Sequence, residues 1–525
     1  MKWIKLMLVS SFMFTLSGCL KDLEPTNDKT AEEIYVSLDG YKSGLAKVYG
    51  AYALTGNQGP TGNGDIQGFD EGFSDFFRLF WTLQELPTDE AVNAWGDAGL
   101  PDFHQMNWSS ANPFILGIYY RTFYQIALAN EFIRQSQPSL VSSRGLSSPD
   151  ATQVATFQAE VRFLRAFQYW VAMDLFGNVP FADENNIPGS FLPEQIDRDQ
   201  IFQYIEAELK ALETLVPAPR TNEYGRVDQA AVWALLARLY LNAEVYTGEA
   251  RWNDALTYSK KVIDAGYTLI PKYSDLGVAD NNVNNTEFIL PINYDGIRTQ
   301  NWGGSTFLIH ASIGGSASPA DFGIDFGWGG NRTTSAIYNL FPDADGRKLF
   351  YTNGQNVEIT SIAKFTDGIG VKKFTNKKKD GTNGSSLTWT DTDVPLFRLA
   401  EMYLIYAEAT VRSGNLANAP TAINYINLLR TRAYGNTTGN ITGAEFLTPA
   451  SALKFIMDER ARELYWEGHR RTDLVRFGLF TSAAYLWPWK GNISNGTSVD
   501  AFRNVYPIPS SEISANTNLK QNTGY

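Results

Sequence analysis

Apolar residues recur at every third or fourth position in several segments of the chain, which is the spacing that lines one face of an α-helix. In residues 228–246 this stripe consists of Val232, Leu235, Leu236, Leu239 and Ala243. The same pattern predicts helices within residues 37–55, 112–135, 152–216, 228–266 and 396–433. These helices come in pairs, and the pair 228–246 with 252–265 covers about the 34 residues of a tetratricopeptide repeat. Helical hairpins without repeat geometry are the alternative.

Residues 267–395 lack this periodicity. Gly, Asn, Asp, Thr and Ser are abundant there, and short apolar runs such as EFILPIN and STFLIHA are typical of β-strands. The predicted fold is therefore mainly α: a tetratricopeptide-like scaffold of helical pairs that supports a large, irregular, loop-rich region with short strands. An aromatic insertion at 56–111 and a C-terminal segment at 451–525 complete a single unit, 31–525.

The N-terminus has the pattern of a secretory signal. Two lysines precede an apolar run from Leu6 to Leu16, which is too short for a stable membrane span, and small residues lead to Cys19. The motif LSGC resembles the bacterial lipobox, so we expect a signal peptide at 1–18, lipidation of Cys19 and a polar tether at 19–30. An ordinary signal with a chance cysteine is the alternative. The following CLKDLEP resembles a surface-export signal of some Gram-negative lipoproteins.

Composition excludes several function classes. The formal net charge of -12 and the pI of about 5.0 give no electrostatic reason to bind phosphate backbones, so nucleic acid is not an expected partner. The single cysteine rules out an intrachain disulfide, and no two of His104, His310 and His469 have a metal-ligand spacing. DADGRK at 343–348 resembles a calcium loop only in its first ligands. We expect no metal and no cofactor.

Catalytic signatures are equally sparse. Glycosidases need two carboxylates about 5 to 10 Å apart, but among 56 acidic residues spacing selects no pair. There is no GxSxG motif, and the one cysteine is the predicted lipidation site. The charge-dense segment 459–478 is predicted to be helical and structural, because Arg and Glu three or four residues apart pair across helix turns. We expect a protein that is not an enzyme; a surface glycoside hydrolase is the alternative.

Aromatic residues make up 14% of the chain, and many tryptophans lie in its irregular parts. Three clusters combine large rings with Gly, Asn, Asp or Arg: Arg78, Trp81, Trp95, Asp97 and Trp108; Tyr294, Arg298 and Trp302; and Trp328, Asn331 and Arg332. A pyranose presents an apolar face of C–H groups and a fringe of hydroxyls. Indole rings can cover the face, and polar side chains can bond the hydroxyls. In the glycine-rich stretch 321–332 we expect flanking glycines to keep the face of Trp328 clear.

Several motifs along nearly the full length resemble the SusD/RagB family of outer-membrane glycan-binding lipoproteins. The carrying residues are LSGC, EVRFLRAFQYWVAMDLFGNVPF, LLARLYLNAEVYTG, FRLAEMYLIYAEA, ERARELYWEGHRRTDLVRFG and VYPIPSSEISANTNLKQNTGY. The motifs LQELPTDEAVNAWGD and GWGGNR are similar to those of the family's starch-binding members. The resemblance implies a lipid-anchored protein on the cell surface. It would bind starch or maltooligosaccharides without cleaving them and cap a TonB-dependent transporter of the SusC type.

The resemblance also implies the binding residues. By position, Arg78 and Trp95 look like two contacts of the family's aromatic arc, and Trp328 looks like its second indole. The third ring falls on Tyr294 or Trp302, and a hydroxyl partner falls on Asp97 or Asn93. A bent row of rings would match the curvature of an α-1,4-glucan, whereas a flat row would suit a β-1,4 chain. The same scaffold carrying another glycan or a peptide is a further alternative.

Overall fold

The structure is a computed structural model that describes residues 30–60, 62, 64–187, 189 and 191–525. The predicted signal peptide 1–18, the lipidation site Cys19 and most of the tether therefore lie outside the described residues. Within the described part of the chain, no helix combines the length and the hydropathy that crossing a membrane requires.

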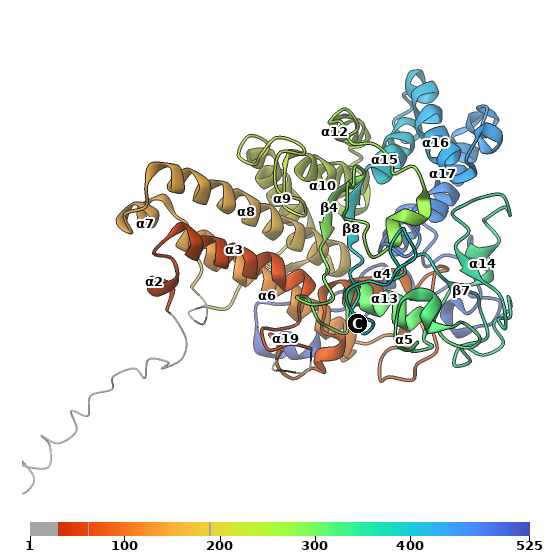
Figure 1. The fold of residues 1–525 in the computed structure, drawn as a ribbon, viewed down its shortest axis with the longest axis horizontal. Helices are drawn as coiled ribbons and strands as arrows, with labels where there is room; N and C mark the ends of the chain where they lie inside the picture. The colour runs from red at the N-terminus through yellow and green to blue at the C-terminus, as the bar shows by residue number, and fades with distance from the viewer. Residues whose placement is uncertain (1–29, 61, 63, 188, 190) are drawn as a thin grey trace, which may run out of the picture.

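Helices dominate the structure (Figure 1). In the first half they are α2 (Ala31–Ile34), α3 (Leu38–Ala53), α4 (Phe76–Glu85), α5 (Asp102–Gln105), α6 (Pro113–Gln135), α7 (Pro138–Ser143), α8 (Ser148–Phe176), α9 (Arg198–Leu212), α10 (Gln229–Leu241), α11 (Ala243–Thr247) and α12 (Trp252–Ile263). The second half adds α13 (Gly304–Ser312), α14 (Ser335–Tyr338), α15 (Leu399–Arg412), α16 (Ala419–Tyr434), α17 (Pro449–Leu464), α18 (Arg470–Arg476) and α19 (Ser510–Ala515).

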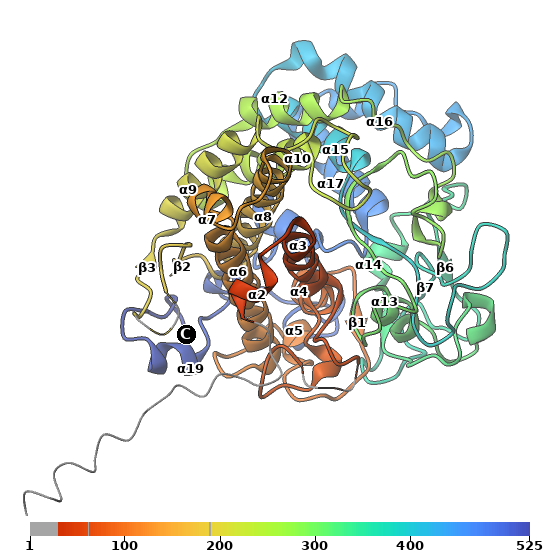
Figure 2. The ribbon, with the colours of Figure 1, turned by 60° about the vertical axis from the view of Figure 1, so that its left-hand side comes forward.

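The long helices pack in sequence as neighbours. α3 contacts α6 and α8, and α8 contacts α9. α10 contacts α12, α12 contacts α15, and α15 contacts α16. Figure 2 shows the result: α9, α10, α12, α15 and α16 follow one another in a curved row, and the loop-rich residues 267–395 occupy the side beyond it. Side-chain caps begin several of these helices, as Asn112 does for α6 and Asp228 for α10. The predicted helical-pair scaffold is confirmed.

The strands are short and form antiparallel pairs: β1 (Val92–Asn93) with β5 (Asn331–Arg332), β2 (Val179–Pro180) with β3 (Gln195–Ile196), β4 (Phe288–Ile292) with β8 (Val394–Arg398), and β6 (Phe350–Tyr351) with β7 (Gly370–Val371). The run EFILPIN is β4, as predicted. The strand expected in STFLIHA is wrong, because residues 304–312 form α13. All of them are buried, so no polar face shows the helical period in the sequence.

The charged segment, residues 459–478, lies inside the protein and is structural, as expected. It is not one continuous helix: α17 ends at Leu464, Trp466 has a φ of 66°, and α18 begins at Arg470. Its ion pairs reach beyond neighbouring turns. Glu463 pairs with Arg398, Arg347 and Arg432, Arg470 pairs with Asp89, and Arg471 pairs with Asp174. The segment thereby connects α17 and α18 to the residues that follow α4 and to α8, α16 and β8.

Candidate functional site

Four tryptophans from distant parts of the sequence meet in one row, which we call the indole row: Trp95, Trp328, Trp302 and Trp389. Successive ring centroids are 6.3, 5.9 and 4.3 Å apart, and successive ring planes are tilted by 42°, 56° and 57°. Each ring is partly exposed. The rings therefore form a continuous surface on which each one is turned relative to the next.

The pairing of β1 with β5 brings the first two rings together. The side chain of Asn93 in β1 donates to Asn331 Oδ1 of β5 at 2.6 Å, and the Asn93 Oδ1 accepts from the Trp95 backbone N–H at 2.7 Å. The indole N–H of Trp95 donates to the Trp328 carbonyl at 3.2 Å. Asn93 was predicted as a possible partner for sugar hydroxyls. It is 1% exposed, and its side-chain amide is already hydrogen-bonded to Asn331 and to the backbone of Trp95.

Glycines beside Trp328 permit close packing. A Cβ at Gly330 would lie 2.5 to 2.9 Å from the ring of Trp95, and one at Gly327 would lie 2.2 Å from the Ile313 carbonyl oxygen. Such distances are shorter than real Cβ contacts, so a side chain at Gly327 would collide with backbone and one at Gly330 would displace the Trp95 ring. The expectation that the glycines keep the ring face clear of side chains is thus incomplete: Gly330 is the surface against which Trp95 rests.

His310 of α13 supports Trp328 from behind. The two rings are stacked, with centroids 4.9 Å apart and planes 30° apart. The Trp328 backbone N–H donates to the His310 carbonyl at 2.7 Å, and His310 Nδ1 donates to the Phe326 carbonyl, also at 2.7 Å. Burial lowers the pKa of His310, against the opposing effect of that carbonyl and of Asp325. The imidazole that packs against the Trp328 indole is therefore neutral.

Arg78 of α4 holds the third ring. Its guanidinium donates to the carbonyl oxygens of Gly72 and Trp302, the latter at 3.0 Å, and lies 4.7 Å from the ring centre of Phe307 and 5.8 Å from that of Trp95. Burial lowers the pKa of Arg78 to about 10, although Asp75, Asp97 and Asp70 oppose the shift. Arg78 thus contacts two residues of the row, Trp95 and Trp302, and also lines an adjacent cavity.

The other predicted site residues take different places. Asp97 is exposed beside Trp95. Tyr294 is 5% exposed, and its ring packs on Gly304, where a Cβ would lie 2.1 to 2.3 Å from ring atoms. A buried ring cannot present a face to a ligand, so Tyr294 is not a stacking ring in this structure and Trp302 is the exposed candidate of the two. Trp108 is likewise buried, at 1% exposure, and donates to the Tyr525 hydroxyl.

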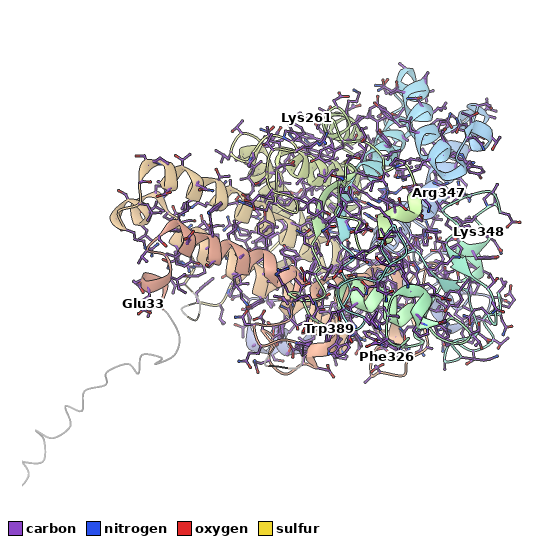
Figure 3. The ribbon with its side chains drawn as sticks, in the orientation of Figure 1. Glu33, Lys261, Phe326, Arg347, Lys348 and Trp389 are labelled. Atoms are coloured by element: carbon purple, nitrogen blue, oxygen red, sulfur yellow. The ribbon has the colours of Figure 1, made fainter. Side chains whose placement is uncertain are left out.

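Sequence reasoning missed Trp389. The residue lies in the stretch TWTDT within the loop-rich region, and its neighbours Thr and Asp have the composition of the other clusters. That composition could have marked it as a candidate ring, but only its tertiary contacts place it beside Trp302. Figure 3 shows Trp389 and Phe326 along the same lower edge of the molecule, away from Lys261 of α12. A hydrogen bond from the Thr388 hydroxyl to Asp325 Oδ2, 2.6 Å long, joins the two loops directly.

Two cavities flank the indole row. One, of about 230 Å³, lies behind Trp95 and is lined by Arg78, Asp97, Asp70 and Thr82 among others. The second, of about 320 Å³, lies between Trp302 and the glycine-rich stretch of residues 64–72, and Asp70 lines it too. A larger cavity of about 440 Å³ lies elsewhere, between α3 and β4. Its walls combine aliphatic residues with three tyrosines and a few charged side chains, and none of the four indoles lines it, so it is separate from the indole row.

The site can therefore bind a flat-faced, hydroxylated ligand. Indole faces supply apolar contact, and the carboxylates of Asp70 and Asp97 and the guanidinium of Arg78 stand beside them as hydrogen-bonding groups. Within the described residues no group of three or more His, Cys, Asp or Glu side chains could hold a metal ion. At DADGRK, Asp345 pairs with Arg347 and Asp343 with Lys348, so these carboxylates already have partners.

Known proteins with similar sequences belong to one family, and a solved structure has a similar fold. The sequence model of the SusD family matches residues 350–525. The chain is 35% identical to the starch-binding protein SusD of Bacteroides thetaiotaomicron, over 100% of this chain and 99% of that protein. It is 25% identical to the SusD-like protein P25 of Formosa agariphila, over 70% of this chain and 73% of that protein. Surface glycan-binding protein A from Bacteroides thetaiotaomicron, solved with laminarihexaose, has a similar fold: TM-score 0.68, 22% identity, 92% of this chain and 99% of that one.

Proposed function

The chain belongs to the SusD family, and on this premise we propose that its indole row binds starch and maltooligosaccharides, which are α-1,4-glucans, without hydrolysing them. One observation carries the proposal: four partly exposed indoles follow one another with tilts of 42°, 56° and 57°. An α-1,4-glucan coils, so its successive sugar faces also turn relative to one another. A surface whose rings are tilted relative to one another can follow such a chain, whereas a straight β-1,4 chain would contact only some of the rings.

A relative that matches over the full length supports the choice of ligand. The protein that matches over the full length is named as starch-binding, and this chain has indoles at 95 and 328 and an arginine at 78, where the family resemblance places its contacts. Each stacked ring is worth about 1 to 3 kcal/mol by analogy with bases stacked on aromatic side chains. Several such contacts, offset by the cost of association, fit a Kd in the micromolar to millimolar range.

The carboxylates of the structure favour binding over hydrolysis. A general acid needs a raised pKa and must reach the glycosidic oxygen. Burial raises the pKa of Glu90 to about 7 and that of Glu85 well above its ordinary value, with Glu90 adding to the latter. Both side chains are buried, at 2% and 0% exposure. Neither can reach a sugar that lies on the row.

Binding to the row would serve import. We propose that lipidation of Cys19 holds the protein on the outside of the outer membrane and that it passes its glycan to a SusC-type TonB-dependent transporter. The signal-like N-terminus and the family motifs support both parts. Labelling with palmitate and co-purification of the transporter from outer membranes test them, and loss of both on Cys19→Ser is the expected result.

A second candidate is the same scaffold with another glycan. The related fold solved with laminarihexaose binds a β-1,3-glucan, which also curves. A glycan array on the protein without residues 1–19 separates the two candidates: starch and maltooligosaccharides are the expected ligands, and laminarin or a peptide alone would contradict the α-1,4 assignment.

Binding by the row is tested by two substitutions, Trp95→Ala and Trp328→Ala, in isothermal titration with maltoheptaose. Each should lower affinity about 5- to 100-fold. Trp252→Ala is the matched control, because this partly exposed indole at the start of α12 belongs to the helical scaffold. Unchanged affinity in both site variants would exclude the row as the site. Reducing ends that accumulate in proportion to protein concentration would show an enzyme instead.

A further inference from the structure

Trp389 closes the indole row at the end where the family resemblance places no contact. Its ring centroid lies 4.3 Å from that of Trp302, with the planes 57° apart. This tilt is close in size to the 56° between Trp328 and Trp302. The ring is partly exposed, so part of its surface is available to a ligand.

Within the part of the chain that the structure describes, the indole N–H of Trp389 has no acceptor, which it shares with two other rings of the row but not with Trp95, whose N–H donates to the Trp328 carbonyl. Trp108, Trp233, Trp466 and Trp489 each donate to a carbonyl, carboxylate or hydroxyl oxygen of the protein. Among the described residues, no group accepts a hydrogen bond from the indole N–H of Trp302, Trp328 or Trp389, and none of these N–H groups is a buried atom without a partner. The indole N–H of Trp389 is thus available to a ligand, as are those of Trp302 and Trp328.

The loop that carries Trp389 is fixed from both sides. Before the ring, Thr388 donates to Asp325 of the loop that carries Trp328. After it, the backbone N–H of Thr390 donates to Thr306 Oγ1 of α13 at 3.2 Å. Asp391 then accepts from the Gly296 backbone N–H at 2.7 Å, which joins this loop to the one that carries Trp302. A ring held in this way loses little conformational freedom when a ligand arrives.

We propose that Trp389 is a stacking position for an additional sugar residue, so that it sets how long a glycan the site prefers. The inference rests on the proposed function. A short oligosaccharide can occupy Trp95, Trp328 and Trp302 without reaching the end of the row. A longer one continues past Trp302 and gains the contact with Trp389. Removal of that ring should therefore weaken long chains and spare short ones.

The test is a length series of maltotriose, maltopentaose and maltoheptaose, titrated calorimetrically into wild type and Trp389→Ala. We expect affinity for maltotriose to stay within about twofold and affinity for maltoheptaose to fall about 5- to 100-fold. Trp302→Ala should weaken every length. Trp389→Phe keeps a smaller ring in place and should recover part of the maltoheptaose affinity, and near-ultraviolet circular dichroism checks that each variant is folded. Trp252→Ala again serves as the scaffold control.

Each remaining outcome decides the question. An equal loss at every length would show that Trp389 only supports Trp302, and no loss at any length would show that it makes no contact; either result overturns the inference while the proposed function stands. If wild type binds no maltooligosaccharide, the α-1,4 proposal fails first. The same variants are then titrated with the length series of whichever glycan the array identifies, and a length-independent result there overturns the inference on its own. A protein that binds no glycan overturns both.

Discussion

The charged segment and the indole row both gather side chains of the kinds that form functional sites, yet the structure uses them in opposite ways. In the charged segment, Glu459 and Glu463 are 0% exposed, and their oxygens pair with several guanidinium groups. In the indole row, rings are partly exposed and three indole N–H groups are left to water. A high density of chemically active residues thus does not identify a site. A site is marked by polar groups and ring faces that stay exposed without a partner in the protein.

The first prediction concerns the charged segment and has the largest expected effect. Glu463→Gln leaves Arg398, Arg347 and Arg432 with fewer counter-charges in a buried environment. Removing one partner of a buried ion pair costs about 3 to 5 kcal/mol, so we expect the free energy of unfolding in urea to fall by about that amount. Glycan affinity of the folded variant should match wild type.

Glu223→Gln is the control for this change. Glu223 also pairs with an arginine, Arg226, at 3.5 Å, but its side chain is 80% exposed, and such pairs contribute about 0 to 1 kcal/mol. If Glu463→Gln and Glu223→Gln destabilise the protein equally, the segment is not the structural element described above.

The second prediction uses pH to measure one buried carboxylate. Burial alone would raise the pKa of Glu459, but the guanidinium groups of Arg347, Arg462 and Arg430 outweigh it and hold the pKa at about 2. A carboxylate with a lowered pKa stabilises the folded state above its unfolded value, near 4.5, and loses that contribution as pH falls toward the folded value. The shift corresponds to about 3 kcal/mol at neutral pH.

Comparison of wild type with Glu459→Gln isolates this contribution from the other titrating groups. The difference in unfolding free energy should be largest at pH 7, hold down to about pH 5, and shrink by about 2 kcal/mol by pH 3. Urea titrations at pH 7, 5, 4 and 3 measure it, with Glu223→Gln as a variant whose difference should stay small throughout. A difference independent of pH would contradict the assignment of Glu459 as ionised in the fold.

Much of the scaffold could be predicted from sequence, because amphipathic stripes such as that of residues 228–246 report which face of a helix is buried. The prediction failed where burial is complete. Residues 304–312 are buried on all sides, so the helical period is absent from their sequence, and the helix depends on tertiary contacts such as the hydrogen bond from the Gly304 N–H to Asp75 Oδ1. The packing of α17 against α18, on either side of the break at Trp466, depends on tertiary contacts too, such as the ion pair between Arg460 and Asp473.

The site was predictable in part for a similar reason. Trp95, Trp302 and Trp328 could be chosen because indoles among glycines and polar residues are poor core formers and because family motifs surround two of them. The burial of Tyr294 could not be predicted, since it depends on Gly304, ten positions later, which leaves room for the ring. Trp389 was missed because no motif marks it; only the contacts of its loop with Asp325 and Thr306 bring it into the row.

The smallest predicted effect is also the most specific for the geometry of the row. Gly330→Ala places a Cβ within 2.5 to 2.9 Å of the Trp95 ring, so the ring must move while every indole remains present. We expect affinity for maltoheptaose to fall about 3- to 10-fold. This loss is smaller than that from removing a ring, because a displaced ring still keeps part of its stacking contact. Isothermal titration measures it.

Gly96→Ala provides a matched control in the residue next to Trp95. No heavy atom lies within 4 Å of its added Cβ, and its φ is not in the left-handed region, so neither the ring nor the backbone has to shift. Unchanged affinity in Gly96→Ala together with a loss in Gly330→Ala would show that binding depends on where the Trp95 ring lies and not on the flexibility of its loop. Equal affinity in both variants would mean that the orientation of Trp95 is unimportant, and the row would then be a set of independent rings instead of a surface shaped to a coiled chain.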